Sequence, residues 1–401
     1  MMGRKKVNDN YDKSIRMIRS ALRRVEPFIK QVKKRKDILL YCDSVTMEEH
    51  IVDFYNNIND MEEVRFFLFY IDGENKYTKK NQEAGIQRVI ENREITPIRE
   101  YKKVVFHSWS LIVCADTFLP FHFCHKDAPA IYINHGLHII SLDGGDNLYA
   151  YTDHWALDVD GEPKFAVMCE PNKRYVELLR EEKPKLKKVI QHVGYKYSEA
   201  ILEEKKNYYQ YRKQLGIKEK EIVVSVFSTW RKECLFQSVG PELVEECKKL
   251  QEKGYRFILS DHPREYFKYD PDIEPSGPYV DSLKKEGFIV RKPEENYIPY
   301  LIAADIVICD YSTFYELALL AGKKLILSDF PETRVWKYSI ARELMKEIPV
   351  FKKDTDLEVL IKKVMNSKEY QALFEKYGIE LQTEEVSYQK KMKEIVEQLI
   401  R

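Results

Sequence analysis

Residues 305–328 read DIVICDYSTFYELALLAGKKLILS, and this stretch carries the strongest indication of the fold. The apolar runs Asp305–Cys309 and Lys324–Ser328 predict two buried strands, and Thr313–Ala321 between them predicts a helix. A strand, a crossover helix and a second strand form the unit that joins parallel neighbours in a sheet. The stretch therefore predicts an α/β protein with a parallel sheet.

The same alternation of strands and helices is predicted along most of the chain. Further strands are expected at Ile38–Cys42, Val64–Tyr70, Val104–His107, Ala130–Asn134, Phe165–Met168, Lys188–His192, Ile222–Phe227, Tyr255–Ser260 and Phe288–Arg291. Helices are expected at Met47–Asn57, Asn172–Glu182, Ser198–Leu215, Pro241–Lys253, Tyr297–Ala304, Asp356–Asn366, Lys368–Tyr377 and Glu385–Ile400.

The charged, tyrosine-rich helix Ser198–Leu215 separates two such series. We therefore expect two Rossmann-like domains facing across a cleft, an N-terminal domain over 37–205 and a C-terminal domain over 206–380. A basic segment over 1–36 precedes them, and a C-terminal helix over 381–401 follows. Ligands in such sheets bind beyond the carboxyl ends of the strands, so functional residues are expected in the loops that follow strands.

Length and composition agree with this architecture. The chain of 401 residues fits two domains, and 44% hydrophobic with 33% charged residues suits folded domains with a solvated surface. The net charge of +1 excludes a globally basic coat for nucleic acid, so no nucleic-acid partner is expected. Neither a membrane-spanning run nor a secretory signal is recognised. Seven scattered cysteines without a C-x-x-C pair indicate reduced thiols in the cytoplasm.

The first 36 residues are unusual because they hold thirteen Lys and Arg against three acidic residues. Apolar residues recur three and four apart within them, as on one face of a helix: Ile15, Ile18, Leu22, Val25, Ile29 and Val32. A basic amphipathic helix can lie on an anionic membrane surface. The alternative is a helix that packs on its own domain and leaves a solvated basic face.

Two histidine clusters follow predicted strands. His135 lies in Asn134-His135-Gly136, where a histidine can act as a base near neutral pH and the glycine permits close approach of a ligand. His262 precedes Pro263, which restricts the path of the chain, and this histidine can donate to a phosphate. The alternative for both clusters is a turn whose histidine has no role in chemistry.

Two further clusters suit anions. Thr229 and Arg231 follow the strand Ile222–Phe227, and the planar guanidinium fits phosphate oxygens. The run Asp310–Glu316 opens the predicted helix: Thr313 and Glu316 match a capping box, and the hydroxyls of Ser312 and Thr313 add donors to a helix N-terminus. Glu316 either caps the helix or binds a ribose diol. The alternative for both clusters is a purely structural loop.

Cofactor signals are weak. His122-x-x-His125 lacks further ligands at metal spacing, and Asp143-Gly-Gly-Asp146 is interpreted as a turn, with a Mg²⁺ site as the alternative. We expect no metal site and no firmly bound cofactor, with Mg²⁺ left open. The absence of Walker A, G-x-G-x-x-G, G-x-S-x-G and kinase motifs disfavours ATP hydrolysis, hydride transfer and serine hydrolysis.

Taken in order, the four clusters resemble the CDP-glycerol glycerophosphotransferases of teichoic acid and capsule synthesis. The resemblance covers about Ala130–Phe330 and is most specific over Ile306–Phe330. Val193-Gly194-Tyr195 is similar to the family's Gly-x-Pro segment, although Lys196 stands where proline is usual. The resemblance implies a GT-B fold and transfer of glycerol phosphate from CDP-glycerol to an acceptor hydroxyl, with release of CMP.

The resemblance also implies roles for the clusters. His135 would be the base that takes the acceptor proton, with Gly136 beside it, and His262 would steady the donor phosphates, with Pro263 beside it. The pyrophosphate would be held by Thr229, Arg231, Ser312 and Thr313, supported by Asp310, and Glu316 would contact the ribose. The implied partners are a CDP-linked polyol phosphate, a lipid-linked or polymer acceptor, and the inner face of the plasma membrane.

Three alternatives stay open. The family usually carries a lysine shortly after His-Gly, whereas residues 137–141 read LHIIS, so ribitol phosphate or another polyol phosphate can replace glycerol phosphate. A GT-B sugar transferase with a nucleotide-sugar donor shares the fold. A catalytically degenerate scaffold protein is the third.

Overall fold

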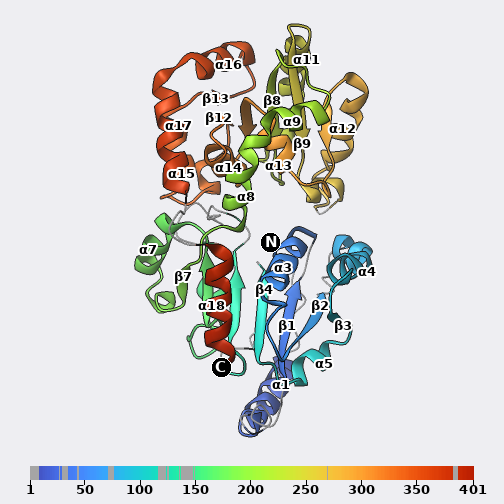
Figure 1. The fold of residues 1–401 in the computed structure, drawn as a ribbon, viewed down its shortest axis with the longest axis vertical. Coiled ribbons are helices and arrows are strands. Elements are labelled where there is room, and N and C mark those ends of the chain that lie inside the picture. The colour runs from blue at the N-terminus through green and yellow to red at the C-terminus, as the bar shows by residue number, and fades with distance from the viewer. Residues whose placement is uncertain are drawn as a thin grey trace. The chain divides into compact units, whose positions relative to one another are not determined.

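The computed structural model describes residues 9–26, 28, 35–42, 45–70, 76–115, 123, 126–134, 136, 148, 150–268, 270–382 and 387–401. The chain forms two compact units (Figure 1). Unit 1 comprises Met1–His135, Ala150–Val193 and Val386–Arg401, and unit 2 comprises Gly136–Tyr149 and Gly194–Glu385. The predicted division between residues 205 and 206 lies within unit 2. The segment from Gly194 to 205 lies with unit 2, because Tyr195 and Ile201 pack in the core of that unit.

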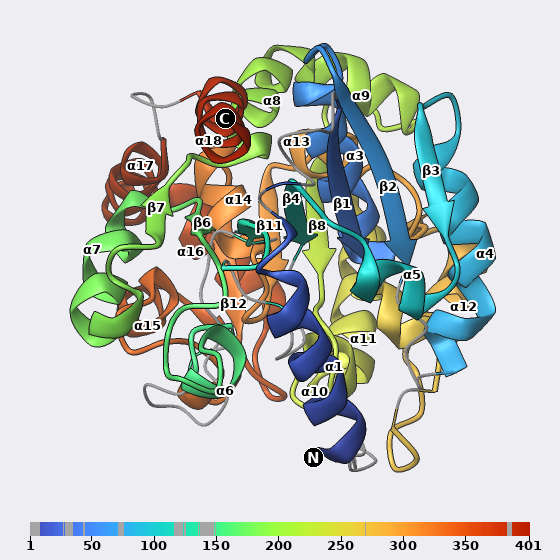
Figure 2. The same ribbon diagram turned by 90° about the horizontal axis from the view of Figure 1, so that it is seen from below.

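Unit 1 is built on a seven-stranded parallel sheet with the order β3-β2-β1-β4-β5-β6-β7. Figure 2 labels all of these strands except β5. Its strands are β1 (Lys36–Cys42), β2 (Val64–Tyr70), β3 (Ile95–Ile98), β4 (Leu111–Ala115), β5 (Ala130–Ile133), β6 (Val167–Glu170) and β7 (Ile190–His192). Strands β4, β5 and β6 are buried along their whole length, as expected for a parallel sheet covered on both faces.

The helices of unit 1 are α1 (Asp9–Leu22), α3 (Val45–Ile58), α4 (Lys76–Ile90), α5 (Tyr101–Phe106), α6 (Asp153–Ala156), α7 (Lys173–Glu182), the 3₁₀ turn η1 (Pro184–Leu186) and α18 (Tyr388–Ile400). Helix α18 ends the chain but belongs to this unit (Figure 1). Met392 and Val396 of α18 are buried in one core with Ile51 and Phe54 of α3. The predicted C-terminal helix is therefore a structural part of the N-terminal unit.

Helix α1 does not present a single apolar face to its unit. Ile15 is buried, and the buried Arg19 donates from Nη1 to the carbonyl of Val105 (3.1 Å) and pairs with Glu26 (3.3 Å). Ile18 and Val25, which the spacing placed on the same face as Ile15, are exposed. The predicted apolar face is wrong in this respect, because a buried arginine occupies the packed side of the helix. Ile29 and Val32 lie outside the described residues.

Unit 2 repeats the architecture with a six-stranded parallel sheet of order β10-β9-β8-β11-β12-β13. Its strands are β8 (Ile222–Phe227), β9 (Tyr255–Ser260), β10 (Ile289–Arg291), β11 (Ile306–Cys309), β12 (Lys324–Ser328) and β13 (Val350–Phe351). In both sheets the strand order reverses beside the first strand, at the β1/β4 and β8/β11 pairs. Ligands of doubly wound sheets bind at such a switch point.

The helices of unit 2 cover both faces of its sheet: α8 (Lys196–Glu204), η2 (Lys205–Asn207), α9 (Tyr208–Gln214), α10 (Leu235–Ser238), α11 (Gly240–Gln251), η3 (Pro263–Tyr266), α12 (Gly277–Ser282), η4 (Leu283–Glu286), α13 (Ile298–Ile302), α14 (Phe314–Leu320), η5 (Glu332–Arg334), α15 (Ile340–Glu347), α16 (Leu357–Asn366) and α17 (Lys368–Leu381). The helix predicted over Ser198–Leu215 is divided into α8, η2 and α9.

Two differences from the prediction concern unit 1. The strand predicted at Val104–His107 is wrong, because Val104 and Val105 lie in α5 and are buried there. Strands β3 and β4 were not predicted.

None of the described helices is both long and apolar enough to cross a membrane. The six described cysteines are buried and none of them forms a disulfide.

Candidate active site

Three of the four predicted clusters meet at the carboxyl edge of the sheet in unit 2. Strand β8 lies between β9 and β11, with Phe227 in register with Ser260 on one side and Cys309 on the other. The loops that begin at Ser228, Asp261 and Asp310 therefore leave the sheet side by side, at the β8/β11 switch point. These loops hold eight predicted site residues: Thr229, Arg231, His262, Pro263, Asp310, Ser312, Thr313 and Glu316.

Asp310 holds the loop after β8. Its Oδ2 accepts hydrogen bonds from the Thr229 amide (2.9 Å), the Leu235 amide (2.9 Å) and the Ser228 hydroxyl (3.2 Å). Its Oδ1 accepts from the Ser312 amide (3.1 Å). Full burial raises the pKa of Asp310, while these hydrogen bonds act in the opposite direction. Asp310 therefore organises two loops from within the protein.

A second buried carboxylate, Glu265, fixes the backbone of Arg231. Its Oε1 accepts from the Arg231 amide (3.1 Å), and its Oε2 accepts from the Gln237 side chain (2.8 Å) and the Ser276 amide (3.2 Å). Arg231 has a φ of 93°, a left-handed conformation that is unfavourable for a residue with a side chain. Such strain is typical of residues whose position serves a function.

Two arginines lie over the ring of Trp230, and a third, Arg334, lies near Arg231. The guanidinium carbons of Arg231 and Arg264 lie 4.4 and 4.3 Å from the centre of the indole ring. Burial and the like charges of Arg334 and Arg264 lower the pKa of Arg231. Arg334 pairs with Glu233 at 2.6 Å. Because all three arginines and Trp230 are half-buried, this arginine cluster combines concentrated positive charge with access for a ligand.

His262 lies beside this arginine cluster, with its ring centre 6.2 Å from that of Trp230. The Nδ1 atom of His262 accepts a hydrogen bond from the Arg264 amide (3.1 Å), so the neutral ring carries its proton on Nε2. The His262 amide in turn donates to the buried Asp261 (2.8 Å). His262 therefore has a fixed orientation and a ring N–H suited to a phosphate oxygen.

The predicted capping box at the start of α14 is wrong. Thr313 adopts helical backbone angles and makes no side-chain cap hydrogen bond. Glu316 is fully buried, and its Oε1 accepts from the hydroxyl of Tyr315 (3.2 Å). Asp310 instead satisfies the Ser312 amide. The Ser312 hydroxyl is buried and has no hydrogen-bond partner among the described residues.

The fourth cluster lies at the division of the chain, with Asn134 in unit 1 and Gly136 in unit 2, and its central residue His135 lies outside the described residues. Asn134 directly follows β5, and its Nδ2 donates to Oε2 of Glu170 (3.3 Å) at the end of β6. The Tyr151 hydroxyl donates to the same oxygen (2.7 Å). Gly136 is buried. Complete burial raises the pKa of Glu170 to about 7, although these hydrogen bonds act to lower it.

The raised pKa of Glu170 predicts a dependence of stability on pH. An unfolded glutamate loses its proton near pH 4.5, whereas folded Glu170 keeps it until about pH 7. The folded state binds more protons in this range, so the contribution of Glu170 to stability is lost as the pH rises. We expect the difference in unfolding free energy between the wild type and Glu170→Gln to change with pH. The wild type should lose about 3 kcal/mol relative to the variant as the pH rises from 4.5 to 7. Denaturant unfolding at several pH values measures this, and a constant difference would contradict the assignment.

Arg264 belongs to the predicted His262 cluster but receives no role from the sequence, and Glu265 and Arg334 are not predicted as site residues. Arg264 and Glu265 directly follow the predicted His262-Pro263 pair. A basic and an acidic residue in a loop after a strand could have indicated that both belong to the site. Arg334 comes from η5 after β12, and only the tertiary fold brings it to Arg231. No three His, Cys, Asp or Glu side chains within the described parts of the chain are placed to hold a metal ion. His122, His125, Asp143 and Asp146 lie outside those parts.

Two Rossmann-like units with this strand order define the GT-B fold, and the solved structures similar to this chain have it too. The wall teichoic acid polymerase TagF is similar with a TM-score of 0.58 at 14% identity, covering 99% of this chain and 98% of that one. The UDP-GlcNAc 2-epimerase from Neisseria meningitidis, bound to UDP-GlcNAc, has a TM-score of 0.54 at 12% identity over 90% of this chain and 99% of that one. Anabaena HepE in complex with UDP-glucose has a TM-score of 0.50 at 12% identity, covering 90% of this chain and 98% of that one. No protein-family model and no curated protein matches the sequence. At these identities the likeness concerns the fold.

Proposed function

We propose that the protein is a transferase that moves glycerol phosphate, or a related polyol phosphate, from a CDP-activated donor to an acceptor hydroxyl. The observation that carries the proposal is the arginine cluster around Trp230, which lies at the switch point of the unit 2 sheet beside His262. TagF, a wall teichoic acid polymerase, is similar to the chain over nearly its whole length.

The charge of the arginine cluster matches a diphosphate. Glu233 pairs with Arg334, and the carboxylates of Asp310 and Glu265 are engaged with backbone amides. Three guanidinium groups therefore leave a positive excess next to a half-buried surface. Guanidinium groups bind phosphate oxygens through paired, charge-assisted hydrogen bonds. A donor pyrophosphate supplies the negative charge that such a site needs.

The proposed reaction is a phosphoryl transfer. The acceptor oxygen attacks the phosphorus that carries the polyol, a new P–O bond forms, and the bond from this phosphorus to the bridging oxygen breaks. CMP leaves with the electron pair of that bond, and the acceptor proton passes to His135. Arg231 and His262 stabilise the charge that develops on the phosphate oxygens, which is the main requirement of this chemistry.

A nucleotide-sugar transferase is the second candidate, because HepE in complex with UDP-glucose shares the fold. Both reactions need a diphosphate site, and they differ in the group transferred.

The test of the proposed function is an assay of CMP release together with incorporation of polyol phosphate into an acceptor. Turnover that depends on a CDP-polyol and is lost in His135→Ala and His262→Ala supports the proposal. Turnover with a sugar nucleotide alone overturns it, and turnover that both variants retain excludes the assigned roles.

We further propose that the N-terminal segment docks the protein on an anionic membrane, where a lipid-linked acceptor of cell-wall or capsule synthesis would lie. Met17 of α1 and Phe28, which follows α1 in the chain, are 74% and 71% exposed, while the buried Arg19 anchors α1 to unit 1. Arg24, which lies between them in the sequence, is exposed as well. Exposed apolar side chains among basic residues are typical of helices that bind at the membrane surface.

Replacing Met17 and Phe28 by serine is expected to lower partition into anionic vesicles by about tenfold or more, because two apolar side chains no longer enter the lipid. Co-sedimentation with phosphatidylglycerol vesicles measures this. Val159→Ser is the matched control, since Val159 is 58% exposed elsewhere on unit 1. Equal binding of the double variant and the wild type would contradict membrane docking through this N-terminal segment.

A further inference from the structure

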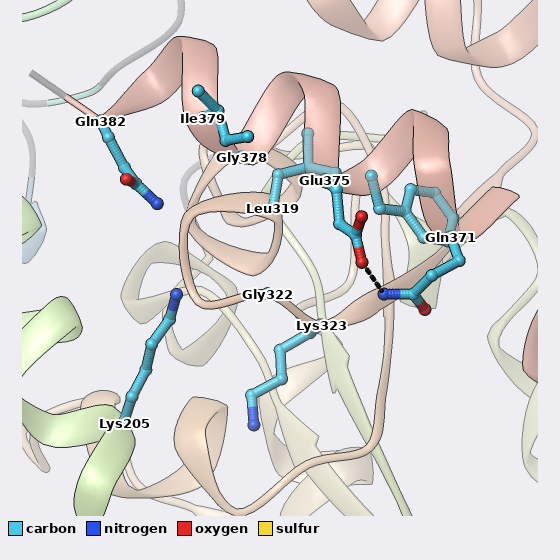
Figure 3. A pocket seen from close by; sticks show the side chains of 10 residues that line it. Lys205, Leu319, Gly322, Lys323, Gln371, Glu375, Gly378, Ile379 and Gln382 are labelled. Atoms are coloured by element: carbon cyan, nitrogen blue, oxygen red, sulfur yellow. Dashed lines mark hydrogen bonds between the residues drawn. The ribbon is translucent and has the colours of Figure 1, made fainter.

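A pocket in unit 2 lies away from the candidate active site. It has a volume of about 220 Å³ and is lined by η2, the end of α14 and one face of α17 (Figure 3). Gly322 in its wall precedes β12, so the pocket belongs to the amino edge of the sheet, whereas the arginine cluster lies at the carboxyl edge. A cavity of about 150 Å³ already holds benzene, so this one can accept a small organic molecule.

Two polar side chains approach each other across the pocket. Lys205 extends from η2 and Gln382 from the end of α17, as Figure 3 shows. Among the residues that the structure describes, neither side chain has a hydrogen-bond or ion-pair partner. Burial lowers the pKa of Lys205, so its ammonium group has lost water without gaining a carboxylate. An anion between Lys205 and Gln382 would supply the missing interaction.

The rest of the wall is largely apolar and rigid. Leu319 and Phe374 are buried, and Ile379 is 68% exposed at the rim. Helix α17 passes so close to α14 that a Cβ on Gly378 would lie 2.7 Å from the carbonyl oxygen of Leu319. This close approach holds the two helices at a fixed separation and keeps the pocket preformed, as is usual for small-molecule sites.

The remaining charges of the pocket limit the ligand to one anionic group. Lys323 is turned away in Figure 3 and donates to the carbonyl of Ile302 (2.6 Å). Burial lowers the pKa of Lys323 to about 8, and the nearby Lys205 adds to this effect. Glu375 lies on the opposite side, where its carboxylate accepts from Gln371 (2.9 Å) and would repel a second negative charge.

We propose that this pocket is a second ligand site, which binds a small organic molecule with one anionic group through Lys205 and Gln382 and holds its carbon body on Leu319, Phe374 and Ile379. The anionic group is a carboxylate or a phosphate ester. Lys205 follows the passage of the chain from unit 1 to unit 2, and Gln382 precedes its return. The site is independent of the proposed transferase activity, so either proposal can fail without the other.

Calorimetric titration of the full chain tests the site with three probes: hexanoate, phenyl phosphate and the uncharged hexanamide. We expect saturable binding of hexanoate or phenyl phosphate, and the stronger of the two identifies the anionic group. Hexanamide should bind the wild type at least about tenfold more weakly than the better anion does. The variant Lys205→Gln should bind that anion at least about tenfold more weakly than the wild type, which corresponds to about 1.4 kcal/mol. Lys205→Arg should keep most of the affinity.

Lys206→Gln is the matched control, because Lys206 is the exposed neighbour and pairs with Glu203 at 3.1 Å outside the pocket. Ile379→Glu should abolish binding without loss of fold, since its side chain is exposed and the new carboxylate repels the anion. Two results overturn the proposal: no saturable binding of either anion at about 10 mM, or binding that Lys205→Gln leaves unchanged.

Discussion

Replacing Arg231 by alanine is expected to lower kcat/KM for the CDP-activated donor by about 10²- to 10³-fold. This is the loss expected when one preorganised donor to a developing negative charge is removed. The guanidinium of Arg231 stacks on Trp230 beside Arg264 and Arg334, and Glu265 fixes its backbone. Steady-state kinetics of CMP release measure the effect.

Three variants separate this role from a general loss of structure. Lys232→Ala removes the neighbouring charge, whose side chain is 76% exposed, and should leave kcat/KM within about threefold of the wild type. Arg231→Lys should recover only a small part of the activity, because an ammonium cannot form the paired bonds of a guanidinium. Arg231→Gly should be as inactive as Arg231→Ala but more stable by about 1 kcal/mol, because glycine tolerates the φ of 93°. Normal activity of Arg231→Ala would exclude the arginine cluster as the donor site.

Replacing Asp310 by alanine is expected to lower the free energy of unfolding of unit 2 by about 3–5 kcal/mol. Three backbone amides would lose their acceptor inside the protein, and the Ser228 hydroxyl would keep only the carbonyl of Thr229 (3.2 Å). Unsatisfied buried donors and broken buried networks cost this much. Asp310→Asn should also destabilise the unit, because an amide nitrogen cannot accept from these donors.

Asp272→Asn is the control for Asp310. Asp272 is exposed on the same unit, so its replacement should change stability by no more than about 0.5 kcal/mol. Denaturant unfolding followed by tryptophan fluorescence measures both, since Trp230 lies in the loop that Asp310 holds. A loss below about 1 kcal/mol in Asp310→Ala would show that this carboxylate does not organise the site.

The sheet of unit 2 could be predicted closely because buried parallel strands are continuous apolar runs. Ile222–Phe227, Tyr255–Ser260 and Lys324–Ser328 were predicted with the bounds that the structure has. In unit 1, β3 was missed because it contains Pro97, which is tolerated here since β3 lies at the edge of the sheet. Val104 and Val105 resembled a strand, but two adjacent buried residues also fit a short helix.

The candidate site was only partly predictable, for a different reason. Residues that directly follow strands, such as Arg231 and His262, can be identified because the strand order brings them together. Asp310 directly follows β11 and is identified in the same way. The second acceptor, Glu265, cannot be identified from its place after a strand, because it acts through a hydrogen bond to the Arg231 amide, which has no sequence pattern of its own. Glu316 matched a helix cap in sequence but lies in the core, because tertiary packing took precedence over the local pattern.

The most direct test of the proposed function is a calorimetric titration of the purified protein with CDP, UDP, CMP and CDP-glycerol. If unit 2 holds a CDP-activated donor, CDP and CDP-glycerol bind with saturation. CMP binds more weakly because it lacks the second phosphate, and UDP shows no saturable binding. Selective binding of UDP would contradict the proposed donor and favour the sugar transferase. Binding of none of the four would contradict a nucleotide donor site at the arginine cluster.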